Sequence, residues 1–204
     1  MIITLSGAKK QADQFKEKYG NYSGPGSLQE VTKPVIDFVN YLIKKYNIKR
    51  ILDAPCGDWS WMQYVDLSGV DYVGYDILEK VIVENIDKYS RENVFFEMKD
   101  IINEDIPIVP DLVICRDFLF HLPDEAITQV INNICNSGAK YFISTSFDYI
   151  RTNEEFTPFS FCNNYGFRRL NLEKEPVSIY PPIEKVYETD SYQCKGRMVG
   201  LWEM

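Results

Sequence analysis

The sequence of 204 residues contains a single histidine, His121. A metal centre built from three histidines is therefore excluded, and any histidine-based chemistry must use this one residue. The five cysteines are scattered and none are paired at metal-ligand spacing, which favours reduced thiols in a cytoplasm. No stretch approaches the roughly 18 uncharged apolar residues of a membrane span, and the start, MIITLSGAKK, lacks the apolar region of a secretory signal. We expect a cytoplasmic protein that contacts no membrane and holds no metal.

Positive charge is also scarce, because 22 Lys and Arg residues stand against 30 Asp and Glu residues, for a net charge of -8. A protein that binds the phosphates of a nucleic acid usually carries the opposite sign, so a nucleic acid is not the expected partner. Hydrophobic residues at 45% and charged residues at 25% are typical of a globular chain. We expect one domain, as a monomer or homodimer, that acts on a small molecule.

Short apolar runs alternate with helical patterns from residue 50 onward. The runs predict strands at 50–54, 72–76, 94–98, 112–115 and 141–145, and the patterns between them predict helices near 78–88 and 124–135. This alternation is typical of a doubly wound, mostly parallel α/β sheet. Two further runs, 183–188 and 198–202, predict a closing antiparallel hairpin.

The segments outside this alternation have other predicted roles. Residues 8–19 favour a helix, and the small residues of 20–27 predict a mobile flap. Ser27 and Glu30 form a capping-box pattern that predicts a helix start, and Pro34 predicts a kink or restart of that helix near Thr32. The single domain then divides into N-terminal helices and flap, cofactor-binding units, a long substrate lid and a hairpin, at 1–49, 50–146, 147–182 and 183–204.

Acidic residues follow three successive predicted strands. The string ILDAPCGDW at 51–59 takes an apolar strand through Asp53 into a tight turn, and Asp76 ends the next strand 23 residues later. Asp100 follows the third strand. Ligands of doubly wound sheets bind at the carboxyl ends of the strands, and a carboxylate about 20 residues after the first turn can accept hydrogen bonds from ribose hydroxyls. Any one of these acids could be only a cap or turn former, so their joint placement carries the prediction of a nucleoside site.

This set of motifs resembles the class I S-adenosylmethionine-dependent methyltransferases over roughly residues 30–146. The resemblance implies that the first turn holds the methionine part of the cofactor, that Asp76 holds the ribose and that Asp100 with Ile101 contacts the adenine. The string DLVICRDFLFHLPDE at 111–125 looks like the fourth strand of that family, with Cys115 and Arg116 beside the cofactor. The full set of expected cofactor residues is Asp53, Ala54, Pro55, Cys56, Gly57, Trp59, Asp76, Ile77, Asp100, Ile101, Cys115 and Arg116.

Two departures from the family turn are Pro55 and Trp59, which replace its first and last glycines. Trp59 could be a core residue or an aromatic face for the sulfonium of the cofactor. The GDW string, together with SGPGS at 23–27, resembles a narrower bacterial group of methyltransferases associated with surface-polysaccharide gene clusters. This likeness implies an oxygen acceptor on a sugar or phosphate-type intermediate.

His121 could be a partly buried histidine with no reactive role or the general base for such an acceptor, and Asp117 is the competing base. Tyr22 and Ser23 in the flap are expected to contact the substrate. Arg168 in the string GFRRLNL could clamp an anionic group of the acceptor or could be a solvated surface charge.

Two other classes of function remain open. A nicotinamide-dependent reductase would use the same sheet and ribose acid, but the glycine-poor turn leaves little room for a pyrophosphate. A non-catalytic nucleoside-binding or partner-binding domain is also possible, since a fold does not fix a function. The missing [DN]PP[YF] string, with CRDF at its place, speaks against enzymes that methylate amino groups of nucleic acids.

Overall fold

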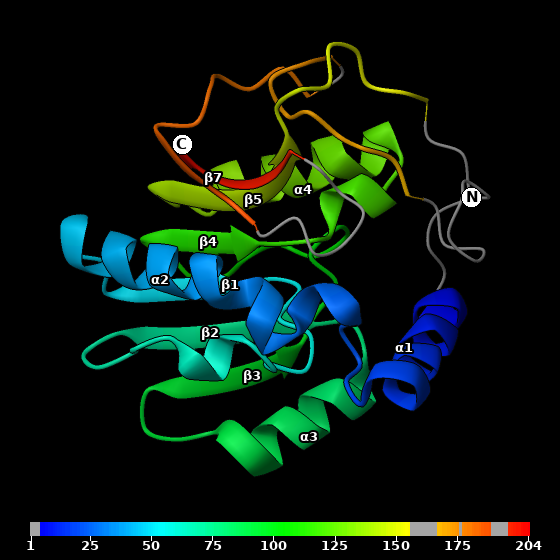
Figure 1. Ribbon diagram of the computed structural model, residues 1–204. Coiled ribbons are helices and arrows are strands. Elements are labelled where there is room, and N and C mark those ends of the chain that lie inside the picture. Colours follow the sequence, from blue (N-terminus) through cyan, green and yellow to red (C-terminus); the bar gives the residue numbers. More distant parts are fainter. Residues whose placement is uncertain (1–4, 156–166, 176, 189–195) are drawn as a thin grey trace.

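Seven strands form one sheet in the order β3-β2-β1-β4-β5-β7-β6 in the computed structural model (Figure 1). The strands are β1 Arg50–Asp53, β2 Asp71–Asp76, β3 Val94–Met98, β4 Leu112–Cys115, β5 Tyr141–Phe147, β6 Glu184–Tyr187 and β7 Arg197–Glu203. Strands β1 to β5 pair in parallel, whereas β7 is antiparallel to both β5 and β6. The structure describes residues 5–155, 167–175, 177–188 and 196–204. The predicted parallel sheet and closing hairpin are confirmed.

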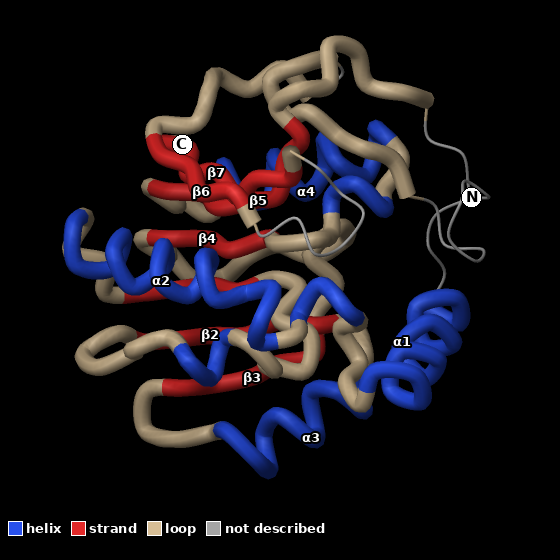
Figure 2. The backbone as a smooth tube through the Cα atoms, in the orientation of Figure 1, coloured by secondary structure: helices blue, strands red, loops and turns tan. Residues whose placement is uncertain are grey.

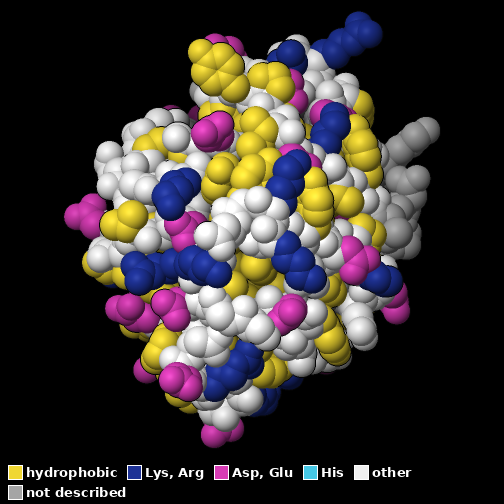
Figure 3. Space-filling model, turned by 90° about the vertical axis from the view of Figure 1, so that its left-hand side faces the viewer, with side chains coloured by type: hydrophobic (Ala, Val, Ile, Leu, Met, Phe, Trp, Pro, Cys, Tyr) yellow, Lys and Arg dark blue, Asp and Glu magenta, His cyan; other side chains and the backbone are white. Residues whose placement is uncertain are grey.

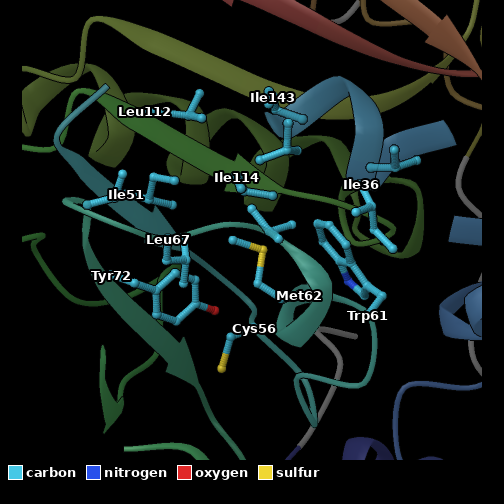
Figure 4. Close-up of a cluster of buried hydrophobic side chains, with 14 of the residues drawn as sticks. Ile36, Ile51, Cys56, Trp61, Met62, Leu67, Tyr72, Leu112, Ile114 and Ile143 are labelled. Carbon is cyan, nitrogen blue, oxygen red and sulfur yellow. The ribbon is translucent and has the colours of Figure 1, made fainter. Parts of the chain in front are cut away.

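Helices cover both faces of this sheet (Figure 2). They are α1 Leu5–Tyr19, α2 Gln29–Lys45, α3 Glu79–Tyr89 and α4 Asp124–Asn136, with short 3-10 turns at Pro25–Ser27, Met62–Tyr64 and Leu119–His121. Apolar side chains of α2 and α3 pack on one face of the sheet. Ile36 of α2 lies there in one cluster with Met62 and Ile114 (Figure 4). The apolar face of α4 packs on the other. Helix α1 lies apart from these layers, near the carboxyl ends of the parallel strands (Figure 1).

Helix α2 differs from its prediction at two points. It begins at Gln29 with Leu28 as the N-cap residue and no side-chain cap hydrogen bond, so the Ser27 to Glu30 capping box is wrong. Ser27 instead ends the preceding 3-10 turn. Pro34 lies inside one helix that runs on to Lys45, so the predicted restart is also wrong. The apolar face of α2 packs on the sheet along its length, and this tertiary packing outweighs the one backbone donor that proline lacks.

The described parts of 147–182 are held by specific contacts. Leu170 and Leu172 are fully buried in the core beside α4. Asn153 donates to the carbonyl of Asn171 at 2.8 Å and accepts from the Asn171 amide at 2.7 Å, and Asn171 donates to the carbonyl of Ile150 at 2.8 Å. Residues 156–166 of the predicted lid lie outside the described residues, as do 1–4, 176 and 189–195.

The face of the molecule opposite α1 carries Lys and Arg side chains mixed with Asp and Glu side chains (Figure 3). Among the described residues, no helix is both long enough and apolar enough to cross a membrane.

Candidate cofactor and active site

Two neighbouring cavities open at the carboxyl ends of β1, β2 and β4. The first has a volume of about 210 Å³ and reaches from Asp76 to Arg116 and His121. The second has a volume of about 240 Å³ and reaches from Asp76 to Asp100 and Leu122. Ala8, Pro55, Asp76, Ile77 and Phe118 contribute to both cavities, so these residues mark the junction between them. Together the cavities could receive one elongated ligand.

The turn after β1 forms the floor of the first cavity. The amide of Cys56 donates to the carbonyl of Tyr75 at 2.8 Å, which ties the turn to β2. Gly57 has a φ of 53°, and a Cβ atom there would lie 2.2 Å from the Ser23 hydroxyl. Glycine is therefore required, because both the backbone conformation and the close approach exclude a side chain. Ser23 accepts from the Asp58 amide at 3.0 Å and donates to the Asp58 carboxylate at 2.9 Å.

Asp76 at the end of β2 occupies the junction of the cavities. One carboxylate oxygen accepts from the Gly57 amide at 3.0 Å and the other accepts from the Leu78 amide at 2.9 Å. These bonds fix the orientation of the carboxylate, and each oxygen keeps a further lone pair for a ligand hydroxyl. Burial raises the pKa of Asp76 to about 6, because no solvent stabilises its charged form.

Asp53 lies deeper in the first cavity and is almost fully buried. The hydroxyl of Tyr72 donates to it at 2.7 Å. Burial, supported by the negative charge of Asp76, raises the pKa of Asp53 to about 7. The first cavity thus contains two carboxyl groups that a positively charged ligand would stabilise in their ionised form.

The second cavity is lined by Asp100, Ile101 and Ile102 on one side and by Phe118 and Leu122 on the other. The Asp100 carboxylate accepts from the Ile102 amide at 2.9 Å and from the side-chain amide of Asn103 at 2.7 Å. Asp100 therefore also organises the turn that follows β3. The mainly apolar walls suit a flat heterocycle.

The wall beyond β4 is formed by Arg116, Asp117, Phe118 and His121, all of which line the first cavity. Asp117 has a φ of 56° and exchanges hydrogen bonds with Thr145, whose hydroxyl donates to its carboxylate at 2.8 Å. Burial alone would raise the pKa of Asp117, but the charges of Arg116 and Arg197 outweigh it and hold that pKa below its usual range. An ionised carboxylate bound to two arginines is a weak proton acceptor, which favours His121 as the base.

Comparison with solved structures identifies the architecture, although no family model and no curated protein matches the sequence. The 1,6-didemethyltoxoflavin-N1-methyltransferase of Burkholderia thailandensis, solved with 1,6-didemethyltoxoflavin and S-adenosylhomocysteine, superposes with a TM-score of 0.70 at 14% identity. That match covers 96% of this chain and 88% of the other. The magnesium protoporphyrin IX methyltransferase of Synechocystis PCC 6803, solved with S-adenosylmethionine, gives a TM-score of 0.62 at 16% identity over 97% of each chain.

The chain has the fold of the S-adenosylmethionine-dependent methyltransferases. A third methyltransferase of this kind, from Clostridium acetobutylicum, matches with a TM-score of 0.59 at 15% identity, over 84% of this chain and 91% of the other.

Within this methyltransferase fold, ten of the twelve expected cofactor residues line one or both cavities: Asp53, Ala54, Pro55, Cys56, Gly57, Asp76, Ile77, Asp100, Ile101 and Arg116. Trp59 does not: its ring packs in the core against Tyr72, Tyr89 and Phe96. Trp59 is 1% exposed, which favours the core alternative over contact with a sulfonium. Cys115 is also a core residue with no exposed surface.

The expected substrate residues lie in two different places in the structure. Tyr22 and Ser23 line the first cavity. Arg168 is buried and lines neither cavity: it donates to the Glu154 carbonyl at 2.9 Å and forms an ion pair with Asp124 at the start of α4. This placement argues against the acceptor clamp, since the guanidinium is committed to holding its segment against α4. The flanking Arg169 is exposed.

Sequence reasoning missed the contribution of α1 to the site. Ala8, Gln11, Ala12 and Phe15 line the first cavity from this helix, and Ala8 also reaches the second. Their spacing of three, four and seven residues places them on one helix face, a signal that the sequence contains. Trp61 both packs in the core and lines the first cavity.

Proposed function

We propose that this protein is an S-adenosylmethionine-dependent methyltransferase that transfers a methyl group to an oxygen of a small molecule. One observation carries the proposal: a buried carboxylate, Asp76, stands at the junction of an apolar cavity and a charged cavity. This order of surfaces matches the order of adenine, ribose and amino acid in the cofactor. The methyltransferase fold of the chain supports the same reading, although fold alone does not fix function.

The residues of the two cavities fit the cofactor part by part. Ile101, Phe118 and Leu122 would contact the adenine, and Asp76 would accept hydrogen bonds from the two ribose hydroxyls. The methionine part would lie over the turn at Gly57, toward Asp53 and Arg116. The carboxyl groups of Asp53 and Asp76, whose pKa is raised, suit a ligand with a positively charged sulfur.

When bound, S-adenosylmethionine would supply a methyl group on a positively charged sulfur, which is a good leaving group. The chain would then have to orient the acceptor, exclude water and remove a proton. His121 lines the first cavity beside Phe118, with its ring 4.5 Å from the ring of Phe120. We assign to His121 the acceptance of the acceptor's hydroxyl proton. Phe15 and Phe118 provide apolar walls that limit the entry of water.

The narrower proposal is that the acceptor is a sugar or phosphate-type intermediate of surface-polysaccharide biosynthesis in the cytoplasm. It rests on the resemblance of the GDW and SGPGS strings to a bacterial methyltransferase group. The aromatic residues Phe15, Tyr22 and Trp61 around the first cavity are compatible with the apolar face of a sugar ring.

Calorimetry tests the cofactor assignment. The protein should bind S-adenosylmethionine and S-adenosylhomocysteine and should show no heat with NAD; binding of NAD alone would replace the proposal with the reductase alternative.

A screen of sugar and phosphorylated metabolites with radiolabelled S-adenosylmethionine then tests the acceptor. Transfer to RNA or DNA with salt-dependent binding would contradict the small-molecule acceptor. Tight cofactor binding without transfer to any acceptor would favour a non-catalytic binding domain.

A further inference from the structure

Four charged side chains form a closed ring beside the first cavity. Arg116 donates through Nε to Glu188 at 3.0 Å and its other nitrogens also pair with Glu188 and, at 3.1 Å, with Asp117. Arg197 forms ion pairs with both Asp117 and Glu188. Each arginine therefore lies between two carboxylates, and the ring carries no net charge.

The ring joins three separate parts of the chain. Arg116 and Asp117 follow β4 and line the cavity, whereas Glu188 follows β6 and Arg197 begins β7. Arg116 also donates to the carbonyl of Gly26 at 2.8 Å, in the loop before α2. The side chains of Arg116 and Glu188 are each 3% exposed. Charges so far from solvent persist only when they are paired, which gives each member a fixed direction.

Only the Arg116 and Asp117 members of the ring reach the cavity. They present a positive and a negative group 3.1 Å apart. Glu188 gives Arg116 a second partner of opposite charge, and Arg197 does the same for Asp117. These pairs fix the direction of both groups at the cavity. A zwitterionic α-amino acid has the matching pair of charges.

We propose that Glu188 and Arg197 are positioning residues that hold Arg116 and Asp117 as a cradle for the α-amino acid end of the cofactor. This inference rests on the proposed function. Arg116 receives the carboxylate and Asp117 receives the ammonium, so Asp117 serves in binding and not as a base. Glu188 and Arg197 act only through these two residues.

The test compares two ligands that differ in the amino acid end alone. S-adenosylhomocysteine has it, whereas 5′-methylthioadenosine keeps the adenine, ribose and sulfur but has no amino acid. Glu188→Gln should weaken binding of S-adenosylhomocysteine about tenfold and leave binding of 5′-methylthioadenosine unchanged in calorimetry. Glu184→Gln is the matched control, because Glu184 also belongs to the hairpin and pairs with Lys45 outside the cavities. It should change neither affinity.

Arg197→Gln and Arg197→Lys form a second pair of variants, which decides the question if Glu188→Gln fails to fold by circular dichroism. Arg197→Gln should behave as Glu188→Gln does, and Arg197→Lys, which keeps the charge, should recover part of the lost affinity. An equal loss for both ligands, or no loss for either, overturns the positioning role while leaving the proposed function intact. A wild-type protein that binds neither ligand refutes the proposed function itself.

Discussion

The pKa values of the carboxyl groups shift in opposite directions on the two walls of the first cavity. On the β1–β2 wall, hydroxyl and amide donors hold Asp53 and Asp76, and burial raises their pKa to about 7 and about 6. On the β4 wall, Asp117 lies between two arginines that lower its pKa. On the first wall only a ligand can supply the positive counter-charge, whereas the arginines of the second wall already supply it to Asp117. We therefore expect binding of the ribose and the sulfonium to depend on the first wall, and proton transfer and binding of the amino acid end to depend on the second.

Replacement of His121 on the β4 wall should have the largest effect. His121→Ala should lower kcat about a hundredfold or more with a hydroxyl acceptor, because the acceptor loses its base, while calorimetry shows nearly unchanged affinity for S-adenosylhomocysteine. His121→Gln, which keeps a polar side chain of similar size, should be as slow. Full activity of both variants would refute the role of His121 as the base.

Replacement of Asp76 should disable binding on the opposite wall. Asp76→Ala removes two hydrogen bonds to a charged acceptor and should lower cofactor affinity by about 1.5–3 kcal/mol, tenfold or more. Asp100→Ala is the comparison, since the Asp100 oxygens already bind within their own turn. Its loss of affinity should be smaller. A folded Asp76→Ala protein with wild-type affinity would refute the ribose assignment.

A change outside both walls should affect stability alone. Arg168→Ala breaks the buried contacts to Glu154 and Asp124 and should lower the free energy of unfolding by about 2 kcal/mol, seen as a lower Tm. Arg169→Ala, at the exposed neighbouring position, should change Tm little. Affinity for S-adenosylhomocysteine should stay constant in both variants. A raised KM for the acceptor with unchanged Tm in Arg168→Ala would restore Arg168 to the substrate site.

The smallest expected effect is the dependence of stability and cofactor affinity on pH. The folded protein holds the protons of Asp53 and Asp76 more tightly than the unfolded chain, so these groups favour folding at low pH. That contribution is lost as pH rises through about 6 to 7. A cationic ligand binds the ionised form, so affinity for S-adenosylmethionine should rise about fivefold between pH 6 and 7.5. S-adenosylhomocysteine lacks the sulfonium charge and should gain less. Equal pH dependence of the two ligands would place the charge effect elsewhere.

The local sequence pattern was sufficient to predict the acidic residues of the site that follow strands. Asp53, Asp76 and Asp100 could be located because apolar runs define the strands and parallel strands bring their carboxyl ends to one edge. Trp59 could not be assigned, because its core position depends on Tyr72, Tyr89 and Phe96, which are distant in sequence. The burial of Arg168 could not be predicted for the same reason, since its partner Asp124 precedes it by more than 40 residues.

Periodicity and residue type within a few positions were enough to predict the parallel sheet, the closing hairpin and the acids after β1, β2 and β3. Tertiary packing was needed to place α1 along the cavities, to bury Trp59 and Cys115 in the core, and to bring Glu188 and Arg197 to Arg116 and Asp117. Those outcomes depend on which distant surfaces become buried together. Tertiary packing also sets the pKa of these carboxyl groups, since burial raises the pKa of Asp53 whereas two neighbouring arginines lower the pKa of Asp117.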